Sequence, residues 1–125
     1  MRHCISYIRF IPLIVYSGIL FYLSHQPQLP HMELGFEWQD KIIHCTAYTI
    51  YGLCANVAWH RHPQRVRLTI IIGCLFGISD EFHQYFIPYR SADIFDWIAD
   101  CLGIFLSLWL WNIAQNLWQK RRKTP

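Results

Sequence analysis

Ser79-Asp80-Glu81-Phe82-His83-Gln84-Tyr85-Phe86-Ile87-Pro88-Tyr89-Arg90 is a polar run between two apolar stretches of the chain. The first apolar stretch is Leu68–Ile78 and the second is Ile94–Ile113. Ionisable and strongly hydrogen-bonding side chains therefore gather where a membrane helix should end. Because polar groups at the edge of lipid hydrocarbon are expensive, we expect this run to serve a purpose in the protein.

The composition favours a membrane protein over a soluble one. Hydrophobic residues make up 54% of the 125 residues and charged residues 15%, whereas soluble domains average about 45–50% and about 25%. The length fits one domain, residues 1–125. A net charge of +3 is too small for the strongly basic surface that nucleic-acid binding requires, so we expect no nucleic acid as partner. The apolar composition makes the lipid bilayer the expected partner.

Four apolar segments predict an all-α fold, a four-helix transmembrane bundle. Each segment is close to the roughly 20 residues that a helix needs to cross hydrocarbon, and none alternates as a strand would. A soluble bundle of buried helices is the alternative fold. The first segment can also be interpreted as a signal peptide, but no small-x-small cleavage site follows it, so we expect an uncleaved anchor. The predicted segments are 7–23, 42–59, 68–86 and 94–117.

Smaller features of these segments carry further predictions. Gly73 and Gly77 give the third segment a small face for close helix packing. Ser91 is predicted to cap the fourth segment. The cysteines are odd in number and lack a C-x-x-C pair, so we expect small core hydrophobes rather than disulfides or a zinc site. They are Cys4, Cys45, Cys54, Cys74 and Cys101.

Lysine and arginine in the short loops predict the orientation. Basic residues cluster before the first segment, between the second and third, and after the fourth. With four spans all three clusters fall on one side, which the positive-inside rule makes cytoplasmic. We therefore expect both termini in the cytoplasm and the other two loops outside. The clusters are Arg2 and Arg9; Arg61, Arg65 and Arg67; and Lys120, Arg121, Arg122 and Lys123.

The outward ends of three predicted helices carry most of the acids and two histidines. Residues three and four apart share a helix face, so Asp96, Asp100 and Gly103 form one stripe, and Asp40 lies on the face of His44. We therefore predict one polar site at the outer surface. The candidate catalytic residues are His44, Glu81, His83 and Asp96, and the candidate substrate-binding residues are Asp40, Lys41, Asp80, Gln84, Arg90 and Asp100.

These residue types suit acid–base chemistry and anion binding. A histidine, or a carboxylate at a membrane rim, can titrate near neutral pH, so His44 or Glu81 can act as a general base. Lys41 and Arg90 can hold a phosphate or carboxylate, and arginine does so through a two-pronged contact.

Three motifs together resemble the VanZ-like family. The first is Asp40-Lys41-x-x-His44-x-x-x-Tyr48, and the third is Asp96-x-x-x-Asp100-x-x-Gly103. The second, Ser79-Asp80-Glu81-x-His83-Gln84-x-Phe86-x-Pro88-x-Arg90, is the most specific. Leu23-Ser24-x-Gln26-Pro27 is similar to the family's first outer loop, and the resemblance runs from about Leu20 to Leu106.

The resemblance implies a small multi-pass protein of the bacterial cell (inner) membrane. It also implies a link to the cell envelope and to antibiotic resistance, because the namesake of the family is associated with low-level resistance to the glycopeptide teicoplanin. It supplies no reaction and no cofactor. This chain departs from the family's pattern at Asp100, where many members have Asn, and at Tyr89, where Gly is frequent.

Three functions remain open on the sequence. The first is an enzyme or binding site for an anionic envelope component, such as a lipid-linked saccharide, a polyprenyl phosphate or a peptide carboxylate. The second is a non-catalytic protein whose polar cluster holds the helices in register. The third is divalent-metal binding through His44, His83, Asp80 or Glu81. No H-E-x-x-H motif is present, so we assign no residue as a metal ligand.

Overall fold

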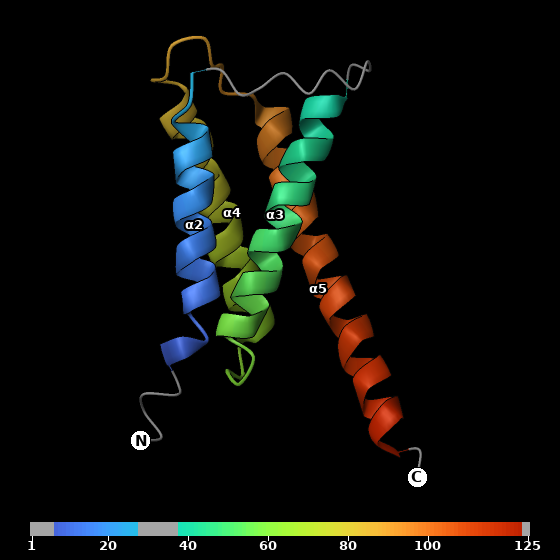
Figure 1. Cartoon of the computed structure of the whole chain (residues 1–125). Helices are drawn as coiled ribbons and strands as arrows, with labels where there is room; N and C mark the ends of the chain where they lie inside the picture. The colour runs from blue at the N-terminus through green and yellow to red at the C-terminus, as the bar shows by residue number, and fades with distance from the viewer. Residues whose placement is uncertain (1–6, 28–37, 124–125) are drawn as a thin grey trace.

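The computed structural model describes residues 7–27 and 38–123 and is built from helices (Figure 1). The described residues contain no strand, and the all-α prediction with four helices is confirmed. Cys4 and Arg2 lie outside the described residues. The helices are α2 (Ile11–Ser24), α3 (Gln39–Ala58), α4 (Arg65–Gln84) and α5 (Ile94–Lys123).

The observed ends of the helices depart from the apolar segments for identifiable reasons. Helices α3 and α4 begin about a turn before the predicted segments, because their first turns are polar and carry no apolar signal. Helix α5 continues to Lys123 because Gln, Lys and Arg favour helix. Helix α2 begins at Ile11, where Pro12 in the first turn suits a helix start.

The prediction that Ser91 caps α5 was wrong. The backbone N–H of Phe95 donates to Asp93 Oδ1 at 2.9 Å, so the side chain of Asp93 caps the helix. Tyr89 in the preceding turn has a φ of 66°, a conformation that glycine adopts more readily.

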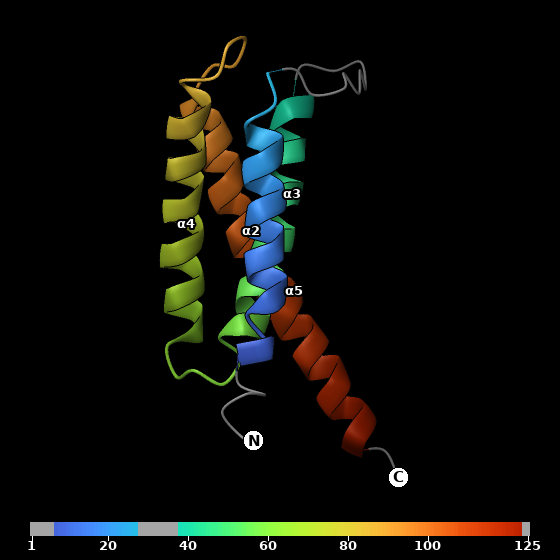
Figure 2. The same cartoon turned by 60° about the vertical axis from the view of Figure 1, so that its left-hand side comes forward.

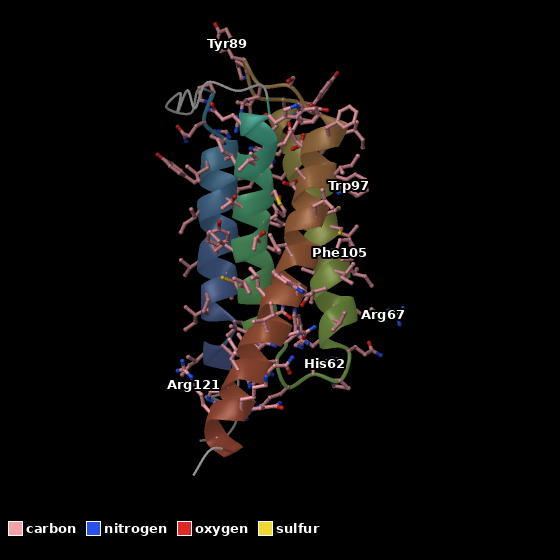
Figure 3. All side chains as sticks on the ribbon, turned by 90° about the vertical axis from the view of Figure 1, so that its right-hand side faces the viewer. His62, Arg67, Tyr89, Trp97, Phe105 and Arg121 are labelled. Carbon is pink, nitrogen blue, oxygen red and sulfur yellow. The ribbon has the colours of Figure 1, made fainter. Side chains whose placement is uncertain are left out.

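The helices pack side by side, and α3 makes its most extensive contact with α5 (Figures 1 and 2). The lower part of α5 continues beyond the other helices. The loop between α4 and α5 lies at one end of the bundle, and the loop between α3 and α4 lies at the other. Figure 3 accordingly shows Tyr89 at one end and His62, Arg67 and Arg121 at the opposite end. The basic loop and the basic C-terminal helix thus share one end.

Small residues let the helices approach closely. A Cβ on Gly103 would lie 2.9 Å from the backbone nitrogen of Thr49 and 3.1 Å from the carbonyl carbon of Tyr48, so α5 rests on the backbone of α3 there. A Cβ on Gly73 would crowd Ile104, and one on Gly77 would lie 3.1 Å from Asp100 Oδ2. The predicted small face of α4 is therefore confirmed, and it packs on α5.

Several polar side chains are buried inside the bundle and many apolar ones lie on its surface, which is the opposite of the usual arrangement in a soluble protein. The fully buried side chains include Asn56, Thr69, Asp100 and Ser107, whereas large apolar side chains are exposed on every helix. Among the described residues one helix, Ile94–Arg122, is long and apolar enough to cross a membrane by length and composition, with a mean hydropathy of 1.5. Helix α2 is apolar but short. That all four helices cross the membrane stays a prediction.

The described cysteines Cys45, Cys54, Cys74 and Cys101 are free and partly buried. They were expected as small hydrophobes of the core, and they lie at its edge instead of fully inside it. One of them also takes part in helix packing through its backbone, since the indole of Trp97 donates to the carbonyl oxygen of Cys74 at 3.1 Å and ties α5 to α4.

Candidate functional site

An ion-pair network centred on Lys41 joins α3 to the start of α5. Its Nζ lies 2.7 Å from Asp93 Oδ2 and 2.5 Å from Asp96 Oδ1. Asp40 Oδ2 is further away, at 3.8 Å, and the Asp40 side chain is 61% exposed. Since the Asp96 side chain is only 6% exposed, Lys41 supplies the charge that this buried carboxylate needs.

The charges within the network stabilise one another. Burial lowers the pKa of Lys41, but the hydrogen bonds to Asp93 and Asp96 outweigh it and leave that pKa above its usual value. The hydrogen bond from Lys41 likewise holds the pKa of Asp93 below its usual value. Both groups are therefore charged over the physiological pH range.

A second cluster, which we call the His44 cluster, consists of His44, Glu81 and Asp100 and lies beside the first. His44 Nδ1 is 3.0 Å from Asp100 Oδ1 and 3.9 Å from Glu81 Oε1. The cluster is buried: Asp100 is 0% and Glu81 7% exposed. The backbone N–H of Asp93 donates to Glu81 Oε2 at 3.0 Å and so links the two clusters.

The His44 cluster contains polar atoms without partners. Glu81 Oε1 and Asp100 Oδ2 are buried and accept no hydrogen bond from any described residue. An unsatisfied buried acceptor costs about 1–3 kcal/mol, more when charged. Within residues 7–27 and 38–123, neither of these two oxygens therefore recovers the cost of its burial through a hydrogen bond.

A small cavity of about 70 Å³, lined in part by His44, lies between α2, α3 and α4. Arg90 reaches its rim from the loop after α4, and its buried Nε has no hydrogen-bond partner among the described residues. The buried hydroxyl of Ser24 also has no hydrogen-bond partner within the described ranges. The polar residues around this cavity are Ser24, His44, Tyr48, Asp80, Gln84 and Arg90.

The structure does not bring His83 to this site. Its Nε2 lies 3.2 Å from His25 Nδ1, and its ring packs on Phe21, so it faces α2. Asp40 lies only at the exposed rim. The remaining candidates surround either the Lys41 network, the His44 cluster or the cavity. They are Lys41 and Asp96; His44, Glu81 and Asp100; and Asp80, Gln84 and Arg90.

A third polar group, at the opposite end of the bundle, was not predicted. Arg65 donates to Asn56 Oδ1, and Asn56 Nδ2 donates to the carbonyl of Gly52 at 2.8 Å. Ser107 Oγ is 3.5 Å from Asn56 Nδ2. A polar amide inside an apolar segment is the sequence signal that points to this group, because such an amide must find a partner within the bundle.

Two sets of donor atoms can hold a metal ion. The oxygens and Nδ1 or Nε2 of each set lie within 4.8 Å of one another. One set is Asp40, His44 and Asp96, and the other is the His44 cluster. The sequence proposed His83 or Asp80 in this role, and neither belongs to these sets. The acid that joins His44 and Glu81 is Asp100, which the sequence assigned to substrate binding.

Comparisons with known proteins show what this sequence is similar to. A family model described as VanZ/LLP1 matches residues 5–115. An uncharacterized protein of the fission yeast Schizosaccharomyces pombe is 35% identical over 115 residues. That alignment covers 90% of this chain but 64% of the yeast protein, so the chain spans less than two thirds of its relative's length. No solved structure matches the chain.

Proposed function

The chain belongs to the VanZ/LLP1 family, and from that premise we propose that it is a four-span membrane protein that binds an anionic, lipid-linked component of the cell envelope from the outer side. The carrying observation is Arg90, a cation without an ion-pair partner among the described residues, at the rim of the cavity beside His44.

The exposed surface supports the membrane part of this proposal. Soluble monomers rarely expose large contiguous apolar patches, yet Ile14, Phe21, Leu75, Leu102 and Phe105 are each about half exposed or more. The interior holds the polar side chains instead. Lipid around the bundle accounts for both facts, because membrane helices bury their polar groups against one another. Helices α3 and α4, 20 residues each, are long enough to span hydrocarbon.

The distribution of charge supports the orientation. Arg67 and Arg121 lie at one end of the bundle and Tyr89 at the other (Figure 3). The positive-inside rule assigns the basic end to the cytoplasm. Both termini are then cytoplasmic, and the Lys41 network, the His44 cluster and Arg90 face outward.

The dimensions of the cavity favour a ligand with a small charged end and an apolar remainder. About 70 Å³ holds roughly two water molecules, so only a headgroup fragment such as a phosphate or carboxylate fits. Leu20 and Leu23 of α2 line the same cavity, and a lipid chain can continue over the apolar surface of α2. A fission-yeast relative further favours a ligand that is not confined to bacterial peptidoglycan, such as a polyprenyl phosphate.

A purely structural role is the second candidate, and the Lys41 network favours it. Lys41, Asp93 and Asp96 satisfy one another and hold α3 against α5. Arg90, in contrast, forms no ion pair with a described acid. Changes at Arg90 therefore separate the two candidates, because they test ligand binding without breaking an ion pair.

We predict that Arg90→Ala weakens the binding of a polyprenyl phosphate by about tenfold or more, since a charge-assisted hydrogen bond is worth about 1.5–3 kcal/mol. Arg90→Lys should retain part of the affinity, because it keeps the charge and loses the two-pronged contact. The measurement is a titration of the full chain in nanodiscs with a polyprenyl phosphate and with the matching neutral polyprenol.

Arg67→Ala is the control, because Arg67 is exposed and lies at the other end of α4. Equal binding of the phosphate and the neutral alcohol, or unchanged binding in Arg90→Ala, would reject the anionic ligand. Teicoplanin susceptibility of bacteria that express the wild-type chain or the variants is the cellular readout that follows from the family. Lost tolerance at normal protein abundance in Arg90→Ala alone would support the link to the envelope.

A further inference from the structure

We propose that the His44 cluster is a divalent-metal site that takes Zn²⁺ or a chemically similar ion through His44, Glu81 and Asp100. The inference goes beyond the anionic ligand proposed above and does not depend on it. It rests on the geometry of the donor atoms, on the two unpartnered oxygens and on the balance of charge.

The donor atoms lie at the spacing of a three-ligand zinc site. With metal–ligand bonds of about 2.0–2.1 Å, the ligand atoms of a tetrahedral site are about 3.3 Å apart. The distances from His44 Nδ1 are 3.0 Å to Asp100 Oδ1 and 3.9 Å to Glu81 Oε1, on either side of that value. All three donors lie within 4.8 Å of one another. Small side-chain adjustments therefore suffice to bind an ion.

The unpartnered atoms point to a missing ligand. Glu81 and Asp100 are each more than nine-tenths buried, and Glu81 Oε1 and Asp100 Oδ2 accept no hydrogen bond from any described residue. The second Glu81 oxygen is held by the backbone N–H of Asp93. That contact fixes the carboxylate as hydrogen bonds around metal ligands commonly do.

The charge balance also favours a cation. Two buried carboxylates face a single imidazole, and Lys41 is committed to Asp93 and Asp96. The structure shows no ion pair between Arg90 and either carboxylate within the described residues. Buried charges are expensive without compensation, and a divalent ion supplies it.

The other set of donors is a poorer site. The carboxylate of Asp96 in that set is already paired through Oδ1 with Lys41 Nζ at 2.5 Å, so an ion there would meet a neighbouring positive charge. Asp40 is mostly exposed. In the His44 cluster, by contrast, no lysine or arginine is paired with the carboxylates, and Glu81 and Asp100 are both buried.

Binding requires one proton to leave. With His44 as the imidazolium paired to Asp100 Oδ1, a metal ion that takes Nδ1 displaces the Nδ1 proton into solvent, while Nε2 keeps its own proton and the ring becomes neutral. The ion then has a bond to Nδ1 and to each carboxylate, and its fourth position is left for water or a ligand. No oxidation or reduction is involved.

The test is the metal content of the full chain in detergent micelles or nanodiscs. After treatment with a chelator, the wild-type protein is dialysed against Zn²⁺, and separate samples against Mn²⁺ and Mg²⁺, and bound metal is measured by mass spectrometry. We expect one Zn²⁺ per chain. Content far below one ion per chain for every metal overturns the proposal without the use of any variant.

Variants then locate the ion. Glu81→Gln and Asp100→Asn keep the shape of the side chain and should each lower Zn²⁺ affinity at least tenfold, at unchanged helicity and elution volume. Asp40→Asn and His83→Gln are matched controls that should bind as the wild type does. Loss of the ion in Asp40→Asn with retention in Glu81→Gln would assign it to the other set and reject the site proposed here.

These results are independent of the anionic ligand. Zinc content does not involve the polyprenyl phosphate, and Arg90→Ala leaves every proposed metal ligand in place. Stoichiometric zinc with no phosphate binding would retain the metal site and reject the proposed function. Arg90-dependent phosphate binding without zinc would do the reverse.

Discussion

Gly103→Val should prevent the bundle from assembling, which is the largest effect we expect from a single change. The side chain would enter the space occupied by the backbone of α3, where a Cβ alone would lie 2.9 Å from the nitrogen of Thr49. Backbone cannot rotate out of the way as a side chain can. Overpacking commonly costs about 1–3 kcal/mol and occasionally more, and we expect the upper end or beyond because α3 and α5 form the main contact of the fold.

Gly18→Val is the matched control on α2, because no atom lies within 4 Å of a Cβ at that position. Its effect should remain within about 0.5 kcal/mol, as for most surface changes. Size-exclusion profiles and thermal unfolding of both variants in detergent measure the difference. If Gly103→Val gave as much folded protein as Gly18→Val, the close approach of α5 to α3 would be incorrect.

The helices and the buried stripe of α5 were predictable because their signals are local. Apolar runs mark the helices, and steps of three and four residues put Asp96, Asp100 and Gly103 on one face. All three are buried in the structure. The signal fails at polar first turns, so the starts of α3 and α4 were placed too late.

The placement of His83 could have been predicted from helix geometry. Residues two apart lie about 200° apart around a helix, so His83 must point away when Glu81 points inward. The sequence shows that Asp80, Glu81, His83 and Gln84 are polar, but it does not show which of them face the other helices. In the structure Asp80, Glu81 and Gln84 are buried, and His83 faces α2.

The pairing of charges depends on contacts between residues far apart in the chain. Lys41 and Arg90 are both cations near the same acids in the sequence pattern, and either one can neutralise them. In the structure Lys41 forms ion pairs with Asp93 and Asp96, whereas Arg90 lines the cavity. The rotation of α3 against α5 decides this, and no local pattern reports that rotation. The same holds for Asp100, which lies 56 residues from its partner His44.

Lys41→Met should lower the free energy of unfolding by about 3–5 kcal/mol, the cost of removing one partner of a buried ion pair. The change leaves Asp96, 4% exposed, without its cation and beside the carboxylates of the His44 cluster. Thermal unfolding in detergent, followed by tryptophan fluorescence, measures the loss. Arg61→Met is the control, because Arg61 is exposed at the other end of the bundle, and it should change stability by no more than about 0.5 kcal/mol.

A second substitution distinguishes charge from packing as the cause. Lys41→Met leaves the carboxylate of Asp96 without its cation, and Asp96→Asn removes that carboxylate. The double variant should therefore have a free energy of unfolding within about 1 kcal/mol of that of Asp96→Asn alone. Partners in one ion pair couple in this way, whereas independent sites simply add. If the two losses were additive instead, the contribution of Lys41 would lie in its aliphatic stem packed between α3 and α5. The buried charge of Asp96 would then be compensated by another group.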